Sequence, residues 1–370
     1  MMSPQDIAEF AAKHVAVKEG LDRQTDFPGG LWKEMGKAGL LGLYLPQSWG
    51  GGGLGSASMV EAGEAFVRAG GNLGMATAWF GHALVARYFL LGFGNADQQA
   101  AWLPALAEGR ITASVAISEP GAGAHPKHLS SEALREGDGY RLHGEKYYVT
   151  NGNIAGLFIV VAITDTQGGR KRFSAFLLPR DCPGLTVQDM PPLDYLRPSQ
   201  HVRLKLNGCK LPASALLGEE GAAFQSMARP FRDVEDIMNA GPKLGALAYQ
   251  LDALLDALRD QDGKPGQELN SALGGLGARL EAMRMLARQG AGMLDERPEA
   301  PQLEKLALAL RIYTGEFQDA LAQARTLGGS PAHVRLDAMT HELSRMRGLA
   351  GDAVQAKLVK LAGAMLAGRS

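Results

Sequence analysis

The sequence predicts an α+β protein in which one all-β segment lies between two helical ones. Apolar residues recur at helical spacing up to about residue 110 and again after residue 222, whereas short β-rich runs fill the segment between them. A chain of 370 residues is also too long for one ordinary core, so several subdomains are expected. We expect an N-terminal helical domain over residues 1–112, a middle β-barrel or sandwich domain over 113–220 and a C-terminal helical domain over 221–370.

The helical segments are bounded by loop and turn residues. In the first segment, helical periodicity marks four stretches, which are Ile7–Val17, Leu31–Leu41, Met59–Val67 and Leu84–Leu91. In the last segment, long helical patterns break near Asp262–Gly266, Glu296–Pro301 and Gly328–Pro331. Helices of ordinary length with short connections are therefore expected on both sides of the β segment.

The middle segment carries six β-rich runs separated by turn clusters such as Asp181–Gly184. The runs are Thr112–Ser118, Tyr140–Leu142, Tyr147–Thr150, Leu157–Ile163, Phe173–Leu178 and Val202–Leu206. Many short strands at close spacing are typical of a β-sandwich or a β-barrel.

Composition excludes several classes of function. A formal net charge of −1 gives no electrostatic basis for binding nucleic acid or an anionic membrane. No apolar run approaches the roughly 20 residues that span a bilayer, and the N-terminus lacks the apolar centre of a signal peptide. The eight histidines and the two cysteines, Cys182 and Cys209, form no metal-ligand grouping. We expect a cytoplasmic protein without a metal site.

Two motifs in the middle segment carry groups that suit a bound flavin. The first, AISEPGAGAHP (Ala116–Pro126), joins a β-prone run to a turn rich in free backbone N–H groups. The second, GEKYYVTNG (Gly144–Gly152), places two adjacent tyrosines on a strand before Thr150 and an Asn-Gly turn. A flavin needs hydrogen-bond donors for its ring, a flat surface beside the ring and a cradle for its pyrophosphate. Taken singly, each motif is equally well read as a plain turn or a half-buried strand.

Both motifs resemble the flavin-binding signatures of the acyl-CoA dehydrogenase family. Leu31–Gly51, Phe93–Gly109 and Thr326–Pro331 also fall where that family has comparable segments, so the resemblance spans nearly the whole chain. It implies the acyl-CoA dehydrogenase fold, in which the C-terminal domain is a four-helix bundle, and it implies FAD as the cofactor.

The resemblance also implies which residues hold the flavin ring. The segment from Val115 to Ala124 would supply the hydroxyl of Ser118 and the N–H groups of the turn. Tyr148 would lie against the ring, and Thr150 would hydrogen-bond its N5/O4 edge.

A second group of residues corresponds to the positions at which family members hold the ADP half of FAD, often across a dimer interface. These residues are Arg259, Arg325, Gly328 and Gly329. Asp262 stands where the family has Phe, and Arg325 stands where it has Gln. The guanidinium of Arg325 suits a pyrophosphate, whereas Asp262 would repel it. We therefore expect weaker FAD binding than is usual in the family, and assembly as a homodimer or homotetramer.

Glu235 is the candidate catalytic base. Phe224, Ala228, Phe231, Glu235 and Met238 are spaced as one helix stripe, and a Glu in the centre of an apolar face is unusual because burying an unpaired carboxylate is costly. Burial would raise its pKa and strengthen it as a base toward a weakly acidic C–H bond. An ion pair with a neighbouring helix is the other interpretation of the same pattern.

The resemblance supports this assignment and also shows where the chain diverges. Family members take the base either from a Glu-Gly pair near the C-terminus, where this chain has Ala350 or a gap, or from the helix on which Glu235 lies. Asp236 replaces a common Arg, and Ala124 replaces a Ser that helps position CoA. Asp233 and Asp236 are expected to weaken CoA binding.

The leading hypothesis is an FAD-dependent oxidoreductase that dehydrogenates an acyl thioester, carried by CoA or a carrier protein, and passes electrons to an electron-transferring flavoprotein. Two alternatives stay open from the sequence. One is a catalytically weak subunit that completes the flavin site of a partner dehydrogenase, and the other is a flavin-dependent monooxygenase on the same fold.

Overall fold

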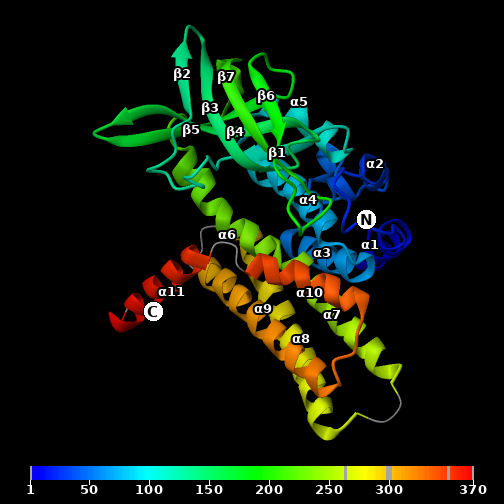
Figure 1. Cartoon of the computed structure of the whole chain (residues 1–370). Helices are drawn as coiled ribbons and strands as arrows, with labels where there is room; N and C mark the ends of the chain where they lie inside the picture. Colours follow the sequence, from blue (N-terminus) through cyan, green and yellow to red (C-terminus); the bar gives the residue numbers. More distant parts are fainter. Residues whose placement is uncertain (1, 262–264, 297–301, 348–350, 369–370) are drawn as a thin grey trace.

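The computed structural model describes residues 2–261, 265–296, 302–347 and 351–368. Helices form the N-terminal part, a single sheet follows, and helices return to form the C-terminal part (Figure 1). Helix α6 (Arg229–Met238) runs between the sheet and the C-terminal bundle in this view. The expected α+β order of helical, β and helical domains is therefore confirmed. We keep residues 112 and 220 as proposed domain limits, since they fall at the start of the first strand and after the last one.

The N-terminal helices begin at capping residues. Ser3 and Asn95 each form a capping box, and the side chain of Asn72 accepts a hydrogen bond from the amide of Met75. The helices are α1 (Pro4–Ala11), α2 (Gly29–Lys37), α3 (Ser56–Gly70), α4 (Leu73–Leu84) and α5 (Ala96–Ala107). The expected helix over Leu84–Leu91 is the end of α4 and its continuation as the π-helical segment η4 (Val85–Leu91).

The sheet has eight strands in the order β6-β7-β3-β2-β4-β5-β8, and β1 pairs in parallel with β4. The strands are β1 (Thr112–Ala116), β2 (Glu132–Glu136), β3 (Gly139–Thr150), β4 (Ala155–Gln167), β5 (Arg170–Pro179), β6 (Leu185–Asp189), β7 (His201–Pro212) and β8 (Leu216–Leu217). Strand β3 contains both Tyr140–Leu142 and Tyr147–Thr150, which were expected as two separate strands. Strands β2 and β6 were missed because they are short and largely solvent-facing, which leaves no apolar pattern.

Strand β4 joins the sheet to the helices because it is buried on both faces. Leu157, Ile159 and Val161 belong to the large core that includes the helices. The alternating residues Phe158 and Val160 belong to a second core inside the β domain. This period-2 division explains why the Leu157–Ile163 run is continuously apolar.

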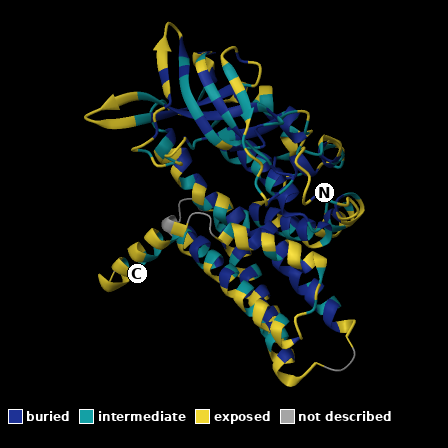
Figure 2. Ribbon diagram, viewed as in Figure 1, coloured by how far each residue is buried: buried dark blue, intermediate teal, exposed yellow. Residues whose placement is uncertain are grey.

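The C-terminal helices place α6 against the middle domain. They are α6, α7 (Ala240–Arg259), α8 (Gln267–Glu296), α9 (Gln302–Leu327), α10 (Val334–Arg347) and α11 (Gly351–Leu366), preceded by the π-helical turn η6 (Phe224–Ala228). Helices α7 to α10 form the bundle, whereas α11 extends away from it and presents exposed residues along its length (Figures 1 and 2).

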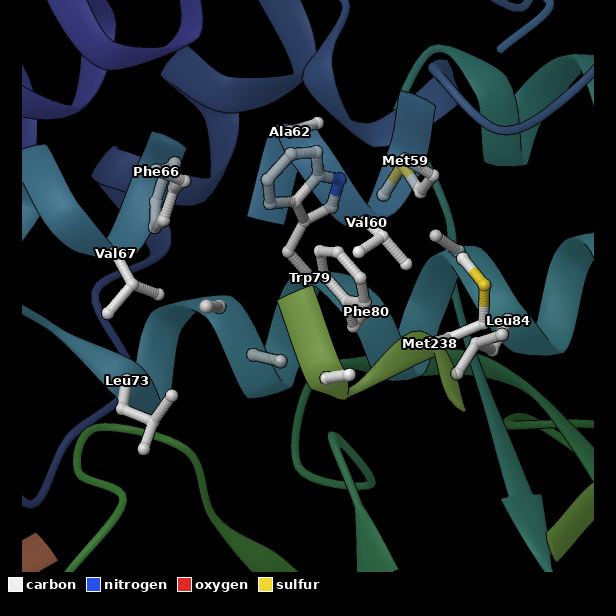
Figure 3. Packing of buried hydrophobic residues seen from close by; sticks show 14 of the residues in the cluster. Met59, Val60, Ala62, Phe66, Val67, Leu73, Trp79, Phe80, Leu84 and Met238 are labelled. Carbon is white, nitrogen blue, oxygen red and sulfur yellow. The ribbon is translucent and has the colours of Figure 1, made fainter. Parts of the chain in front are cut away.

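Glycines on α7 allow it to lie directly on α3. A Cβ on Gly241 would stand 2.3 Å from the carbonyl oxygen of Val60, and one on Gly245 would stand 2.5 Å from that of Glu64. Around this contact, Phe66 and Val67 of α3 pack with Trp79 and Phe80 of α4, and Met238 of α6 enters the same core (Figure 3). This close approach fixes the start of α7, and therefore α6, against the N-terminal domain.

Gly241→Ala is expected to destabilise the fold by about 1–3 kcal/mol, since its methyl group would collide with a backbone atom rather than with a flexible side chain. The matched control is Gly277→Ala in α8, where no atom lies within 4 Å of the added Cβ. That change should be neutral or stabilising by about 0.5–1 kcal/mol, because Ala is the better helix former. Urea unfolding measures both, and equal effects of the two changes would contradict the proposed close packing.

Candidate active site

A cavity of about 280 Å³ lies where the three domains meet. One wall comes from β1, β3 and the turn after β1, and the other comes from α4, η6 and α6. The lining residues are Thr77, Gly81, Leu84, Val85, Ser114, Val115, Ile117, Ser118, Ala124, Tyr147, Tyr148, Thr150, Phe224, Ala228, Phe231, Arg232, Glu235 and Asn239. The cavity therefore brings together Glu235 and all five residues expected around the flavin ring.

The two sequence motifs meet along the β wall. The amide of Tyr147 donates to the carbonyl oxygen of Ser118 at 2.9 Å, which joins the turn to strand β3. The pairing of β3 with β7 is interrupted between Lys146 and Val149, and Tyr148 has a φ of 56°. Such a bulge re-aims a side chain, and Tyr148 is consequently exposed at the cavity instead of packing in the sheet.

A buried ion pair holds this arrangement in place. Lys146 and Glu119 are almost fully buried, and the Lys146 Nζ lies 2.8 Å from the Glu119 Oε1. The Glu119 carboxylate also accepts hydrogen bonds from the amides of Ser130 and Ser131. Burial opposes ionisation of Glu119, but Lys146 and these hydrogen bonds outweigh it and lower the pKa of Glu119 to about 2. The Glu119 carboxylate therefore stays ionised, whereas burial lowers the pKa of Lys146 against the opposing effect of Glu119. Breaking such a pair typically costs about 3–5 kcal/mol.

The β wall offers groups that fit a flavin. Among the residues that the structure describes, none hydrogen-bonds to the hydroxyl of Ser118 or Thr150, although both residues line the cavity. Val115 and Ala124 also line it, and Tyr148 presents its ring there. Hydrogen-bonding hydroxyls without a partner, next to an exposed aromatic ring, are what an isoalloxazine needs from a protein. The individual roles of these residues stay predictions.

The helical wall carries Glu235. Phe224, Ala228, Phe231 and Glu235 line the cavity from η6 and α6, as the stripe in the sequence suggested. Met238 does not; it is buried in the N-terminal core, where its sulfur lies 3.9 Å from the hydroxyl of Tyr44. Asn239, four residues after Glu235, takes its place in the cavity. Asn239 rather than Met238 continues the cavity-lining face after Glu235, because position i+4 lies closer to that helix face than i+3 does here.

The carboxylate of Glu235 is held in an environment that favours its protonated form. Its side chain is exposed at the cavity surface, yet protein encloses the cavity and removes much of the bulk solvation. This desolvation, followed by repulsion from Asp236, raises the pKa of Glu235 to about 7, against the opposing effect of Lys243, Arg311 and Arg232. Among the described residues none forms an ion pair with Glu235, so the structure gives no support to the ion-pair interpretation.

The two aspartates of α6 face away from the cavity and are paired. Asp236 lies 2.5 Å from the guanidinium of Arg311 on α9, and Asp233 lies 3.0 Å from Lys357 on α11. Their negative charges are therefore compensated from neighbouring helices. The two aspartates should therefore repel an anionic carrier less strongly than the sequence alone suggests.

The residues expected to hold the ADP half of FAD lie elsewhere. Arg259 is at the end of α7, and Arg325, Gly328 and Gly329 are at the end of α9, at the far end of the bundle from the sheet (Figure 1). None of them lines the cavity. Arg325 is paired with Asp337 at 2.6 Å. Asp262 and Ala350 lie outside the described residues.

Comparisons with known proteins decide the family. The family model "Acyl-CoA dehydrogenase, N-terminal domain" matches residues 2–110, and "Acyl-CoA dehydrogenase, middle domain" matches residues 114–209. An acyl-CoA dehydrogenase of Bacillus subtilis is 30% identical over 79% of this chain and 78% of its own length. The chain belongs to the acyl-CoA dehydrogenase family. A second relative, the L-prolyl-[peptidyl-carrier protein] dehydrogenase of Pseudomonas fluorescens, is 31% identical over 87% of this chain and 86% of its own length.

Solved structures of this family share the fold. Butyryl-CoA dehydrogenase from Megasphaera elsdenii superposes with a TM-score of 0.84 at 24% identity, covering 98% of both chains. A glutaryl-CoA dehydrogenase from Mycobacterium smegmatis, in complex with FADH2, gives a TM-score of 0.82 at 25% identity and covers 99% of this chain and 94% of its own. The protein is an FAD-dependent dehydrogenase of the acyl-CoA dehydrogenase family. In the described parts of the chain there is no metal-ligand cluster, and no helix is long and apolar enough to cross a membrane.

Several cavity residues could not be found from the sequence. Thr77 and Gly81 come from α4, about 155 residues before Glu235, and nothing in their local pattern marks them as site residues. Asn239 and Arg232 carried a weak signal, because each lies one helical turn from Glu235.

The pKa of Glu235 makes the pH dependence of catalysis testable. If Glu235 acts as a base, it must be ionised, so kcat/KM should rise about tenfold per pH unit below pH 7 and level off above it. Asp236→Asn removes a charge that raises the pKa of Glu235, so the midpoint should move to lower pH. A profile that is flat between pH 5 and 8, or a midpoint that moves upward in the variant, would contradict this assignment.

Proposed function

We propose that the protein oxidises an acyl thioester at the Cα–Cβ bond, with Glu235 as the base that removes the α-proton. The observation that carries the proposal is a carboxylate without an ion-pair partner among the described residues, with a pKa raised to about 7, in the same cavity as the flavin-binding motifs. A base whose pKa lies near the working pH is efficient in proton abstraction.

The chemistry follows from what each wall supplies. The Glu235 carboxylate takes the proton from Cα and becomes a carboxylic acid, while the hydride leaves Cβ and a Cα–Cβ double bond forms. Bound FAD supplies the acceptor for that hydride. Ser118, Thr150 and Tyr148 would hold the flavin ring, and Phe231 and Leu84 would keep water away from the reacting carbons.

The proposal also names the acyl carrier and the electron acceptor. The carrier is CoA or the pantetheine arm of a carrier protein, as the names of the relatives in Bacillus subtilis and Pseudomonas fluorescens suggest for the family. An electron-transferring flavoprotein would reoxidise the enzyme, in keeping with a structural neighbour of that title.

Glu235→Gln tests the base directly. The change keeps the shape of the side chain and removes the proton acceptor, so flavin reduction by a suitable thioester should slow about 100- to 10,000-fold. Asp233→Asn on the same helix is the matched control, because Asp233 does not line the cavity. Stopped-flow bleaching of the flavin measures both rates.

The two interpretations of Glu235 differ in what else changes. If Glu235 is a base without an ion pair, Glu235→Gln leaves the FAD content and the melting temperature unchanged. If Glu235 is half of a buried ion pair, the same substitution costs about 3–5 kcal/mol of stability. A Glu235→Gln protein that reduces its flavin at the original rate would remove Glu235 from the mechanism. Monooxygenase chemistry, or a base near Asp352, whose side chain lies outside the described residues, would then take precedence.

We also propose that the chain forms at least a homodimer in which one subunit completes the FAD site of the other. The support is that Arg259, Arg325, Gly328 and Gly329 do not line the cavity of their own chain and lie at the opposite end of the bundle. Isologous dimers are the most common assembly, and an interface of this kind would bring these residues to a partner's cofactor.

Arg325→Ala is expected to raise the FAD dissociation constant about 10- to 100-fold, the usual effect of losing a hydrogen bond to a charged group. Arg345→Ala, another ion-paired arginine of the same domain, is the control and should leave it unchanged. Fluorescence titration with FAD and light scattering provide the measurements. A stable monomer that binds FAD normally would refute the shared site.

A further inference from the structure

Arg232 is the one cation that lines the flavin cavity among the described residues. It lies one helical turn before Glu235 on α6, and its Nη2 donates to the carbonyl oxygen of Ala124 at 3.2 Å. Because Ala124 belongs to the turn after β1, the side chain of Arg232 reaches from the helical wall to the β wall. The guanidinium therefore stands at the boundary of the space that a ligand would occupy.

This guanidinium has unused hydrogen-bonding capacity. Arginine carries five N–H donors in a planar fork and no acceptor. In the part of the chain that the structure describes, the side chain of Arg232 makes the one hydrogen bond to Ala124 and no ion pair. Most of its donors are therefore free to bind a ligand.

A second cavity of about 330 Å³ lies between α6, α9 and α11 and shares Arg232 and Glu235 with the first. Its other described lining residues are Asp236, Leu308, Arg311, Val354 and Lys357. The two other cations of this cavity are each ion-paired with an aspartate of α6. Arg232 consequently supplies a positive charge without a paired carboxylate at the place where the two cavities meet.

The chemistry of the guanidinium indicates what it binds. Its planar fork matches the paired oxygens of a carboxylate or a phosphate, which accept two parallel hydrogen bonds. Glu235 faces the same two cavities but forms no ion pair with Arg232 among the described contacts. In the proposed reaction Glu235 becomes neutral when it accepts the α-proton, so its repulsion of a bound anion falls as the reaction proceeds.

We infer that Arg232 binds an anionic oxygen group of the thioester substrate and selects substrates that carry one. The inference rests on the proposed function, because it takes an acyl thioester as the occupant of the cavity. Since Arg232 borders both cavities, the group is either the carboxylate of a short acyl group in the flavin cavity or the phosphate of the pantetheine arm in the second cavity.

The test is calorimetry of the FAD-loaded protein with three unreactive thioethers. They are S-butyl pantetheine, S-(3-carboxypropyl) pantetheine and S-butyl phosphopantetheine, so each anionic compound adds one group to the first. We expect one of them to bind about 10- to 100-fold tighter than S-butyl pantetheine, the usual effect of hydrogen bonds to a charged group. The compound that gains affinity identifies the acyl group or the carrier arm as the source of the anion.

Variants of Arg232 should remove this preference. Arg232→Gln removes the charge and the fork, so the preference should fall to about twofold or less, whereas Arg232→Lys keeps the charge alone and should retain part of it. Arg229→Gln is the matched control and should leave it unchanged, because Arg229 is an exposed arginine of the same helix that lines neither cavity.

The titrations are made at pH 6 to keep the charge of Glu235 out of the comparison. Burial raises the pKa of Glu235 to about 7, so at pH 6 its carboxyl group is largely protonated. Loss of the nearby cation in Arg232→Gln favours the protonated form further, which would assist the binding of an anion. A fall in preference therefore cannot arise from Glu235.

The binding data separate this inference from the proposed function. If thioesters fail to bleach the flavin while the preference and its loss in Arg232→Gln persist, the proposed reaction fails and the inference stands. Equal binding of the three thioethers, an unchanged preference in both Arg232 variants, or an equal loss in Arg229→Gln would overturn the inference. A tenfold rise in the FAD dissociation constant of Arg232→Gln would also overturn it, by assigning the guanidinium to the cofactor's pyrophosphate.

Discussion

The buried pair of Glu119 and Lys146 is the interaction on which the cofactor side of the site depends. It joins the turn after β1 to strand β3, and these two segments supply most of the β wall, including Ser118, Tyr148 and Thr150. A buried carboxylate is tolerated only with such compensation, and Ser130 and Ser131 complete it. The neighbouring bulge can then hold Tyr148 with a positive φ without loosening the strand.

The catalytic side depends on a different constraint. Glycines of α7 allow the helix to approach the backbone of α3, and this contact holds the end of α6 at the edge of the N-terminal domain. Glu235 therefore faces a cavity whose other wall belongs to another domain. Catalysis of this kind needs both walls to be fixed, because proton and hydride leave adjacent carbons and small displacements are costly.

The tertiary structure shows how charge is balanced at a position where the chain diverges from its family. Asp236 stands where the family commonly has Arg, but Arg311 from α9 lies against it and restores a cation nearby. Asp236 still raises the pKa of Glu235, so the change adjusts the base without removing positive charge from the region.

The sequence by itself determined the order of domains, the two flavin motifs and Glu235, because each depends on local periodicity or on residues close together in the chain. It did not reveal β2 and β6, whose exposed residues carry no apolar pattern, or the place of Met238 in a distant core. Only the tertiary structure decided that Thr77 and Asn239 line the same cavity as Glu235, and that Arg325 lies outside it at the far end of the bundle. Those relations arise from packing between segments more than 100 residues apart, for which a single sequence contains no local signal.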